Sequence, residues 1–170
     1  MTRNFERLLT SIVKESHTKV KDLRLLTDER RKQILVDWND TAAPYPKDKT
    51  IHQLFEEQVI KTPNNTAVVF EDSELTYKEL NQKANQLARL IRIKYKQQNK
   101  KELKPDSLIG LCVERSLDMI VGILGILKAG AAYVPLDPDY PLDRLDYMIK
   151  DSHEGLIITQ KAVVDRDGFL

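Results

Sequence analysis

The sequence predicts an α/β fold with a mainly parallel sheet, flanking helices and an N-terminal helical extension. From residue 108 onward, short apolar runs alternate with segments of helical periodicity, in the order strand 108–113, helix 117–129, strand 131–136, helix 141–150 and strand 156–159. This alternation is typical of parallel strands joined by right-handed crossover helices. The unbroken apolar run 108–113 further indicates a strand that is covered on both faces.

The first 49 residues are predicted to form a separate helical extension. Residues 4–15 carry apolar side chains at helical spacing, and Thr27 is a candidate N-cap for a second helix that includes Trp38. Residues 39–49 contain two prolines and several charges, which are typical of a linker. We therefore place a domain boundary after residue 49 and expect units 1–49 and 50–170.

Two capping boxes and a hairpin are expected at the start of the second unit. Thr50 and Gln53 form the first capping box, which opens a short helix that ends before Pro63. Segments 66–70 and 74–77 alternate as the two strands of a hairpin. The second capping box, Thr76 with Glu79, opens a long helix directly after the hairpin.

Glycine and proline mark the turns of the predicted parallel part. Gly130 lies where the helix 117–129 must end, with Lys128 in its last turn, where a cation is favourable. Gly122 and Gly125 allow close packing of that helix, which we expect to be buried almost all round. Pro141 has the backbone geometry that suits the first position of the next helix.

Composition excludes several classes of function. A formal net charge of +1 and 41% hydrophobic residues favour a globular protein without a nucleic-acid partner. A run of basic residues is best interpreted as a solvated helix end and loop, and comprises Arg89, Arg92, Lys94, Lys96, Lys100, Lys101 and Lys104. Charges within the apolar window 108–127 exclude a membrane span, and without a leader segment we expect a cytoplasmic chain. Cys112 is predicted to be a buried, reduced thiol.

No catalytic, cofactor-binding or metal-binding residue is predicted. His17, His52 and His153 lie far apart and have no second ligand type at metal-binding spacing. Asp137, Asp139 and Asp143 could in principle hold a cation or act as acid and base. We favour a structural role for these acids, since acids before and within a first helical turn satisfy its free amides. No glycine-rich phosphate loop is present.

Several motifs nevertheless resemble one family. Residues 75–80, LTYKEL, and 127–136, LKAGAAYVPL, resemble the first two core motifs of the adenylation domains of nonribosomal peptide synthetases. These domains belong to the AMP-forming acyl-activating superfamily. Residues 113–116, VERS, fit the same pattern, and segments 25–27 and 38–41 resemble the passage that joins a condensation domain to an adenylation domain.

The resemblance implies a function for a complete domain. Such a domain activates an amino acid with ATP and Mg as aminoacyl-AMP and loads it on the phosphopantetheine thiol of a peptidyl carrier protein. The family's phosphate loop, amino-acid pocket and catalytic lysine belong to later sequence, so no residue role is carried over. We expect residues 1–49 to be the tail of a condensation domain with its linker, residues 50–170 to be an incomplete adenylation domain, and the chain alone to be inactive.

Alternative interpretations remain open from the sequence. The chain could be a non-catalytic docking or complementing subunit of a split synthetase, or a gene remnant. A small independent nucleotide-binding domain is disfavoured because the phosphate loop is missing. An incomplete sheet should leave an unpaired edge, through which we expect self-association.

Overall fold

A computed structural model describes residues 2–14, 16–152 and 155–166. The chain divides into two compact units, residues 1–47 and residues 48–170, and each is treated by itself. Along the described ranges, each helix is either too short or too polar to cross a bilayer.

The first unit is helical and has no buried side chain among the described ones. It comprises α1 (Thr2–Lys14), the 3-10 turn η1 (Val20–Asp22), α2 (Asp28–Leu35) and the 3-10 turn η2 (Asp37–Asn39). The predicted N-cap is confirmed, because the Thr27 hydroxyl accepts a hydrogen bond from the Arg30 amide at 3.2 Å. The expectation that Trp38 lies on α2 is wrong. Helix α2 ends at Leu35 and Trp38 lies in η2, where the side-chain amide of the next residue, Asn39, donates to the Ile34 carbonyl.

The second unit begins with a helix and a hairpin, as predicted. Helix α3 (Ile51–Lys61) has the Thr50 and Gln53 capping box. Strands β1 (Thr66–Phe70) and β2 (Ser73–Thr76) pair antiparallel, and β2 leads directly into α4 (Tyr77–Asn99), which has the second capping box. A small apolar cluster joins this part to the helices, with Leu80, Ala84, Val121 and Leu124 at its centre.

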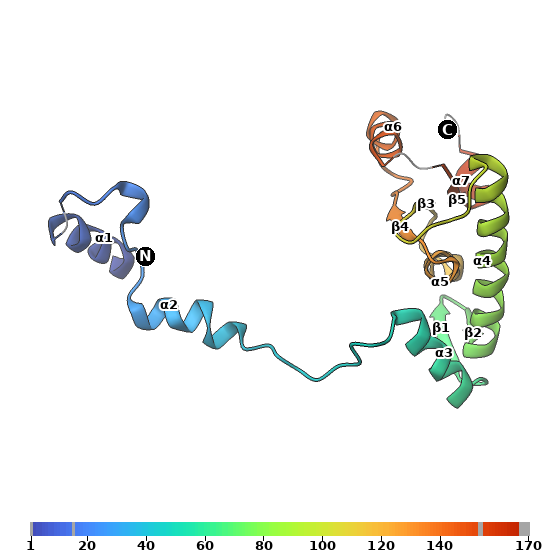
Figure 1. Cartoon of the computed structure of the whole chain (residues 1–170), viewed down its shortest axis with the longest axis horizontal. Helices are drawn as coiled ribbons and strands as arrows, with labels where there is room; N and C mark the ends of the chain where they lie inside the picture. Colours follow the sequence, from blue (N-terminus) through green and yellow to red (C-terminus); the bar gives the residue numbers. More distant parts are fainter. Residues whose placement is uncertain (1, 15, 153–154, 167–170) are drawn as a thin grey trace. The chain divides into compact units, whose positions relative to one another are not determined.

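A three-stranded parallel sheet forms the rest of the unit. Its order is β4 (Ala132–Pro135), β3 (Leu108–Cys112), β5 (Ile157–Thr159), with β3 in the middle. Helix α5 (Leu117–Ala129) connects β3 to β4, and α6 (Leu142–Asp151) connects β4 to β5 (Figure 1). The predicted parallel α/β pattern is therefore confirmed.

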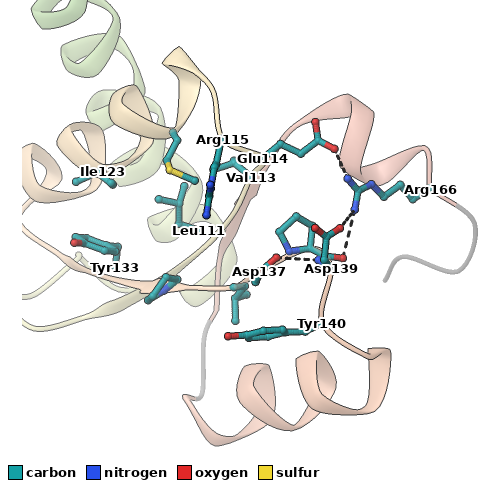
Figure 2. Close-up of a pocket in the computed structure, with 14 residues that line it drawn as sticks. Leu111, Val113, Glu114, Arg115, Ile123, Tyr133, Asp137, Asp139, Tyr140 and Arg166 are labelled. Atoms are coloured by element: carbon teal, nitrogen blue, oxygen red, sulfur yellow. Dashed lines mark hydrogen bonds and ion pairs between the residues drawn. The ribbon is translucent and has the colours of Figure 1, made fainter. Parts of the chain in front are cut away.

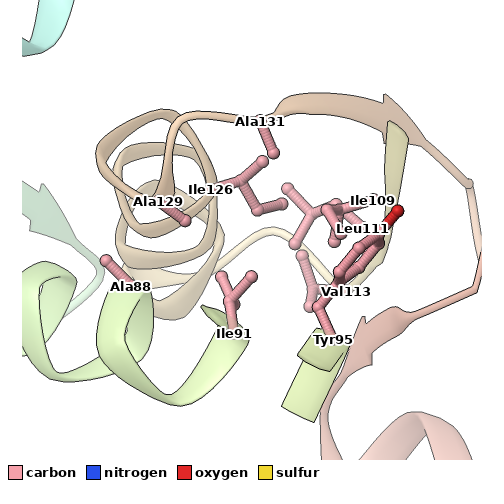
Figure 3. Close-up of a cluster of buried hydrophobic side chains, with 9 residues drawn as sticks. All are labelled: Ala88, Ile91, Tyr95, Ile109, Leu111, Val113, Ile126, Ala129 and Ala131. Carbon is pink, nitrogen blue, oxygen red and sulfur yellow. The ribbon is translucent and has the colours of Figure 1, made fainter. Parts of the chain in front are cut away.

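Side chains of β3 alternate between the two faces of the sheet. Ile109, Leu111 and the following Val113 pack with α4 and α5 in the main core cluster (Figure 3). Cys112 points the other way and packs with Leu136, Leu145 and Val163, which brings α6 and α7 (Lys161–Val164) to the opposite face. Both faces of β3 are thus covered, which explains its unbroken apolar sequence.

Two glycines of α5 bring its backbone close to its neighbours. A Cβ atom at Gly122 would lie 2.7 Å from Leu111 Cδ1, and one at Gly125 would lie 2.7 Å from Leu87 Cδ2. Asp118 is the one exposed residue among the thirteen of α5. The predictions of close packing and near-complete burial are confirmed.

The predicted end of α5 agrees with the structure, whereas the predicted start of α6 differs from it. Gly130 has φ 86° and ends α5 in the left-handed conformation, as expected. Pro141 precedes the first helical residue and is the N-cap of α6, with φ −53° and ψ 141°, so the expectation that it occupies the first helical position is wrong by one residue. The extended ψ places Pro141 outside the helix, while its carbonyl accepts a hydrogen bond from the Leu145 amide at 3.1 Å, as expected of an N-cap residue.

Candidate functional site

The strand connections diverge at the carboxyl ends of β3 and β4. The loop after β3 leads into α5 on one face of the sheet, whereas the loop after β4 leads into α6 on the other face. In open α/β sheets, the crevice at such a switch point is the usual place of ligand binding. The topology therefore points to this edge of the sheet before any side chain is considered.

A cleft of about 670 Å³ lies at this place (Figure 2). Its floor is apolar and is formed by β3 with the residue after it, α5 and β4, namely Leu111, Val113, Met119, Ile123, Tyr133 and Pro135. Its rim is polar and is formed by the two divergent loops and the segment after α7, with Glu114, Arg115, Asp137, Asp139, Tyr140 and Arg166. An apolar floor with a few polar groups at the mouth is typical of binding sites.

Arg166 joins three loops at the rim of the cleft. One terminal nitrogen contacts Asp139 Oδ1 at 2.9 Å, and the other pairs with Glu114 Oε1. The hydrogen bonds to Asp139 and Glu114 raise the pKa of Arg166 further above its ordinary value. Figure 2 shows the guanidinium between the two carboxylates. No sequence pattern indicated this residue, because its partners lie 27 and 52 positions away in the chain.

Gln160 makes a second connection between these loops. Its side-chain oxygen accepts from the Glu114 amide at 2.9 Å, while its side-chain nitrogen donates to Ser116 Oγ at 3.0 Å and Asp118 Oδ2 at 3.2 Å. The amide of Gln160 thus fixes the turn between β3 and α5 from the end of β5. Together with Arg166, it holds the rim in one arrangement.

The predicted acidic residues have separate roles. Asp137 Oδ1 accepts from the Asp139 amide at 3.0 Å, and Asp139 pairs with Arg166. Only Asp143 lies in the first turn of α6, so the expectation that all three acids serve that helix is wrong. Within the described ranges, no group of three or more histidine, cysteine or acidic residues is placed to hold a metal.

The remaining candidate residues are spread through the chain. His17 is exposed in the first unit, His52 is half-buried on α3, and His153 lies outside the described residues. Cys112 is free and buried, as predicted. Burial raises the pKa of its thiol to about 11, with a further rise from the Asp137 carboxylate that Arg166 opposes. A thiol held in its neutral form is a poor nucleophile.

The side chains of the cleft suit recognition better than catalysis. Among the described residues, its lining contains no serine, cysteine or histidine, and the carboxylates of Glu114, Asp137 and Asp139 already accept hydrogen bonds. The same carboxylates outnumber the two arginines of the rim, which opposes binding of a triphosphate. The described lining residues include no glycine that could form a cradle for phosphate. The described residues therefore do not fit ATP with Mg by themselves.

The chain belongs to the AMP-binding enzyme family, whose model matches residues 55–169. Among curated relatives, it is 47% identical to tyrocidine synthase 3 of Brevibacillus parabrevis, over 94% of this chain and 2% of that protein. It is 45% identical to gramicidin S synthase 2 of Brevibacillus brevis, over 99% of this chain and 4% of that protein. The chain thus spans only a few per cent of the length of these relatives.

Solved structures give the same assignment. The nonribosomal peptide synthetase FmoA3, in an AMPPNP-bound form, matches 96% of this chain and 17% of its own length, with a TM-score of 0.67 and 27% identity. The N-terminal subdomain of Klebsiella oxytoca NpsA shares the fold over 66% of this chain and 28% of its own, with a TM-score of 0.56 and 24% identity. The predicted relationship to the adenylation domains of peptide synthetases is confirmed.

Proposed function

We propose that this chain contributes the N-terminal part of the large subdomain of an adenylation domain in a nonribosomal peptide synthetase. The complete domain would activate an amino acid with ATP and Mg as aminoacyl-AMP. It would then load the amino acid on the phosphopantetheine thiol of a peptidyl carrier protein. The family match over residues 55–169 supports this proposal most directly.

We propose that this part of the domain supplies a scaffold and that residues 1–170 alone do not activate an amino acid. The cleft at the carboxyl ends of β3 and β4 has an apolar floor and a hydrogen-bonded rim, but the chemistry of its described lining does not fit ATP with Mg. In this proposal, the remainder of the adenylation domain supplies the phosphate loop and the amino-acid pocket. Residues 1–49 would be the end of a condensation domain with its linker, and the protein would act in the cytoplasm.

Amino-acid-dependent exchange of pyrophosphate into ATP tests this proposal. Purified chain 1–170, with ATP, Mg and a panel of amino acids, should give no exchange above a sample without protein. A complete adenylation domain from a peptide synthetase serves as the positive control. Exchange by the chain that depends on one amino acid would show that residues 1–170 contain the catalytic parts, against the proposal.

A docking role through the open sheet is a second candidate. Each of β4 and β5 pairs only with β3 among the described strands, so both present an unpaired edge. Tyr133 and Pro135 of β4 are also exposed beside the cleft. We propose that later strands of the domain, or a second copy of the chain, cover the unpaired edge of β4. Sedimentation that shows a monomer at high concentration would contradict pairing between copies.

A further inference from the structure

A second hollow of about 600 Å³ lies on the helical face of the same unit, and it shares no residue with the cleft. It lies among α3, α4 and α5 and is called the basic groove here. Its lining is polar apart from one alanine, and comprises His52, Gln53, Glu56, Asn85, Ala88, Arg89, Arg92 and Lys128. Of these side chains, only Lys128 lies within a segment that resembles a family motif, residues 127–136.

One of the three cations of the basic groove is neutralised within the protein. Lys128 is buried, with 4% of its side chain exposed, and its ammonium group pairs with Glu56. The ammonium group also lies 5.7 Å from the centre of the Phe55 ring. Glu56 is the one carboxylate among the described residues that line the groove, so this pair leaves the positive charge of Arg89 and Arg92 unbalanced there.

The two arginines are oriented by hydrogen bonds that use only one nitrogen each. Arg92 Nε donates to the Ala129 carbonyl at 2.9 Å, at the end of α5, and Arg89 Nε donates to the Asn85 carbonyl at 3.2 Å. The terminal nitrogens of both guanidinium groups have no ion-pair partner among the described residues. An anchored guanidinium with free terminal nitrogens is suited to bidentate pairing with a carboxylate.

The groove continues as a stripe along α4. Asn85, Arg89, Arg92 and Lys96 follow one another at intervals of four, three and four residues, which places them on one face of the helix. At 1.5 Å per residue, this stripe is about 16 Å long. Lys96 at its far end pairs with Glu102 at 2.5 Å and is therefore partly neutralised.

We infer that the basic groove binds an acidic peptide segment of a partner protein, with carboxylate side chains paired to Arg89 and Arg92. The length of the stripe favours a peptide over a single small anion, because Arg89 and Arg92 are exposed and lie side by side along an open surface. Polar side chains of Gln53, Asn85 and His52 flank the two arginines and can bind polar side chains of the peptide. This inference goes beyond the proposed function and does not require adenylation activity.

Fluorescence anisotropy with a defined probe tests the inference. The probe is a labelled helical peptide with three glutamates spaced four and three residues apart, and its control has glutamine at these positions. The full chain should bind the glutamate peptide and not the glutamine peptide at low salt. Changing both arginines, in Arg89→Gln/Arg92→Gln, should weaken binding about tenfold or more, as expected for loss of charge-assisted hydrogen bonds.

A matched variant distinguishes an effect of the groove arginines on binding from an effect of the protein's net charge. Lys83 and Lys94 are exposed on the opposite face of α4, so Lys83→Gln/Lys94→Gln removes the same charge without changing the groove. This variant should bind like the unmodified chain. The double arginine variant also loses the contact of Arg92 with α5 and could be unstable for that reason. Arg89→Gln alone avoids this, because the Nε hydrogen bond of Arg89 lies within α4, and it should also weaken peptide binding.

Three results would overturn the inference. Equal weakening by the two double variants would show that only net charge matters. Absence of binding to the glutamate peptide would show that the groove does not recognise carboxylates. Complete displacement of the peptide by an equimolar short DNA duplex would identify a polyphosphate surface in place of a peptide site.

Discussion

Helices α1 and α4 begin from the same kind of sequence pattern and differ in what covers them. Apolar side chains recur at helical spacing in both, but Phe5 and Val13 of α1 are 61% and 81% exposed. In α4, the stripe of Leu80, Ala84, Ala88, Ile91 and Tyr95 is buried. Periodicity therefore predicts that a helix forms, while burial depends on whether another element packs against it.

The same contrast holds for the two units. Residues 48–170 bury an apolar cluster on each face of β3, whereas no described side chain in residues 4–47 is buried. If burial is the main source of stability, substitutions in the second unit should have large effects and matched substitutions in the first should have small ones.

The largest difference is expected for loss of an apolar side chain. Ile126 is fully buried between α5 and the sheet, so Ile126→Ala should lower the free energy of unfolding by about 2–5 kcal/mol. Leu9→Ala on α1 should change the stability of the second unit by less than about 0.5 kcal/mol. Urea unfolding followed by circular dichroism measures both. A comparable loss in the two variants would contradict the contrast.

A glycine contact sharpens the comparison within the second unit. Gly125→Ala would place a Cβ atom 2.7 Å from Leu87 Cδ2, so it should cost about 1–3 kcal/mol through overpacking. Leu87→Ala removes the obstructing atoms, and the double variant should therefore lose less than the sum of the single variants. Urea unfolding of all four proteins gives the coupling energy. Additive losses would show that the contact is not responsible.

Helix caps should show an intermediate effect that depends on pH. Hydrogen bonds from Thr76 hold the pKa of Glu79 below its ordinary value, so the ionised form stabilises the fold. This contribution is present above the pKa of the unfolded carboxyl group and is lost as pH falls through the lower, folded value. Thr76→Ala should cost about 1 kcal/mol at neutral pH and reduce the loss of stability on acidification.

The corresponding cap in the first unit provides the control. The Thr27 hydroxyl accepts from Arg30 without a reciprocal acidic partner, so Thr27→Ala should leave the acid dependence of the second unit unchanged. Unfolding measured at several pH values between neutral and acidic conditions compares the two variants. If both variants reduced the loss of stability on acidification equally, the acid dependence would belong to a group other than Glu79.

Removal of a surface ion pair should change stability least, and the change should be equally small in both units. Lys96 pairs with Glu102 at 2.5 Å, and Lys32 lies 4.0 Å from Asp37, with all four side chains more than half exposed. Lys96→Gln and Lys32→Gln should each change stability by less than about 0.5 kcal/mol, because exposed pairs are screened by solvent. Thermal unfolding at low and high salt checks this. A large loss for Lys96→Gln alone would mean that charge contributes to the difference between the units.

Local signals in the sequence predicted most of the elements but not how they meet. Both capping boxes and the glycine that ends α5 were predicted, because each depends on residues a few positions apart. Helix α7 was not predicted, since four residues cannot show a helical period. Trp38 was placed on the wrong element because apolar spacing continues past the residue where α2 ends.

The sequence predicted no site residue, and the cleft follows only from the folded structure. The acids after β4 were considered as a cation or acid–base site and were given a structural role. Arg166 was not singled out, because its carboxylate partners come from two other loops. Lys128 was expected at a helix end, where a cation interacts favourably with the helix dipole. The structure shows in addition that its ammonium group is buried against Glu56, which lies 72 positions earlier.

The sequence by itself determined the α/β class, the order of strands and helices along the chain and the relationship to adenylation domains. These depend on composition, periodicity and short motifs, which are local properties. Only the tertiary structure decided that β3 lies between β4 and β5, that the loops diverge into a cleft with Arg166 at its rim, and that Arg89 and Arg92 lie beside α3 in a basic groove. Each of these arises from contacts between residues far apart in the chain, which no local pattern encodes.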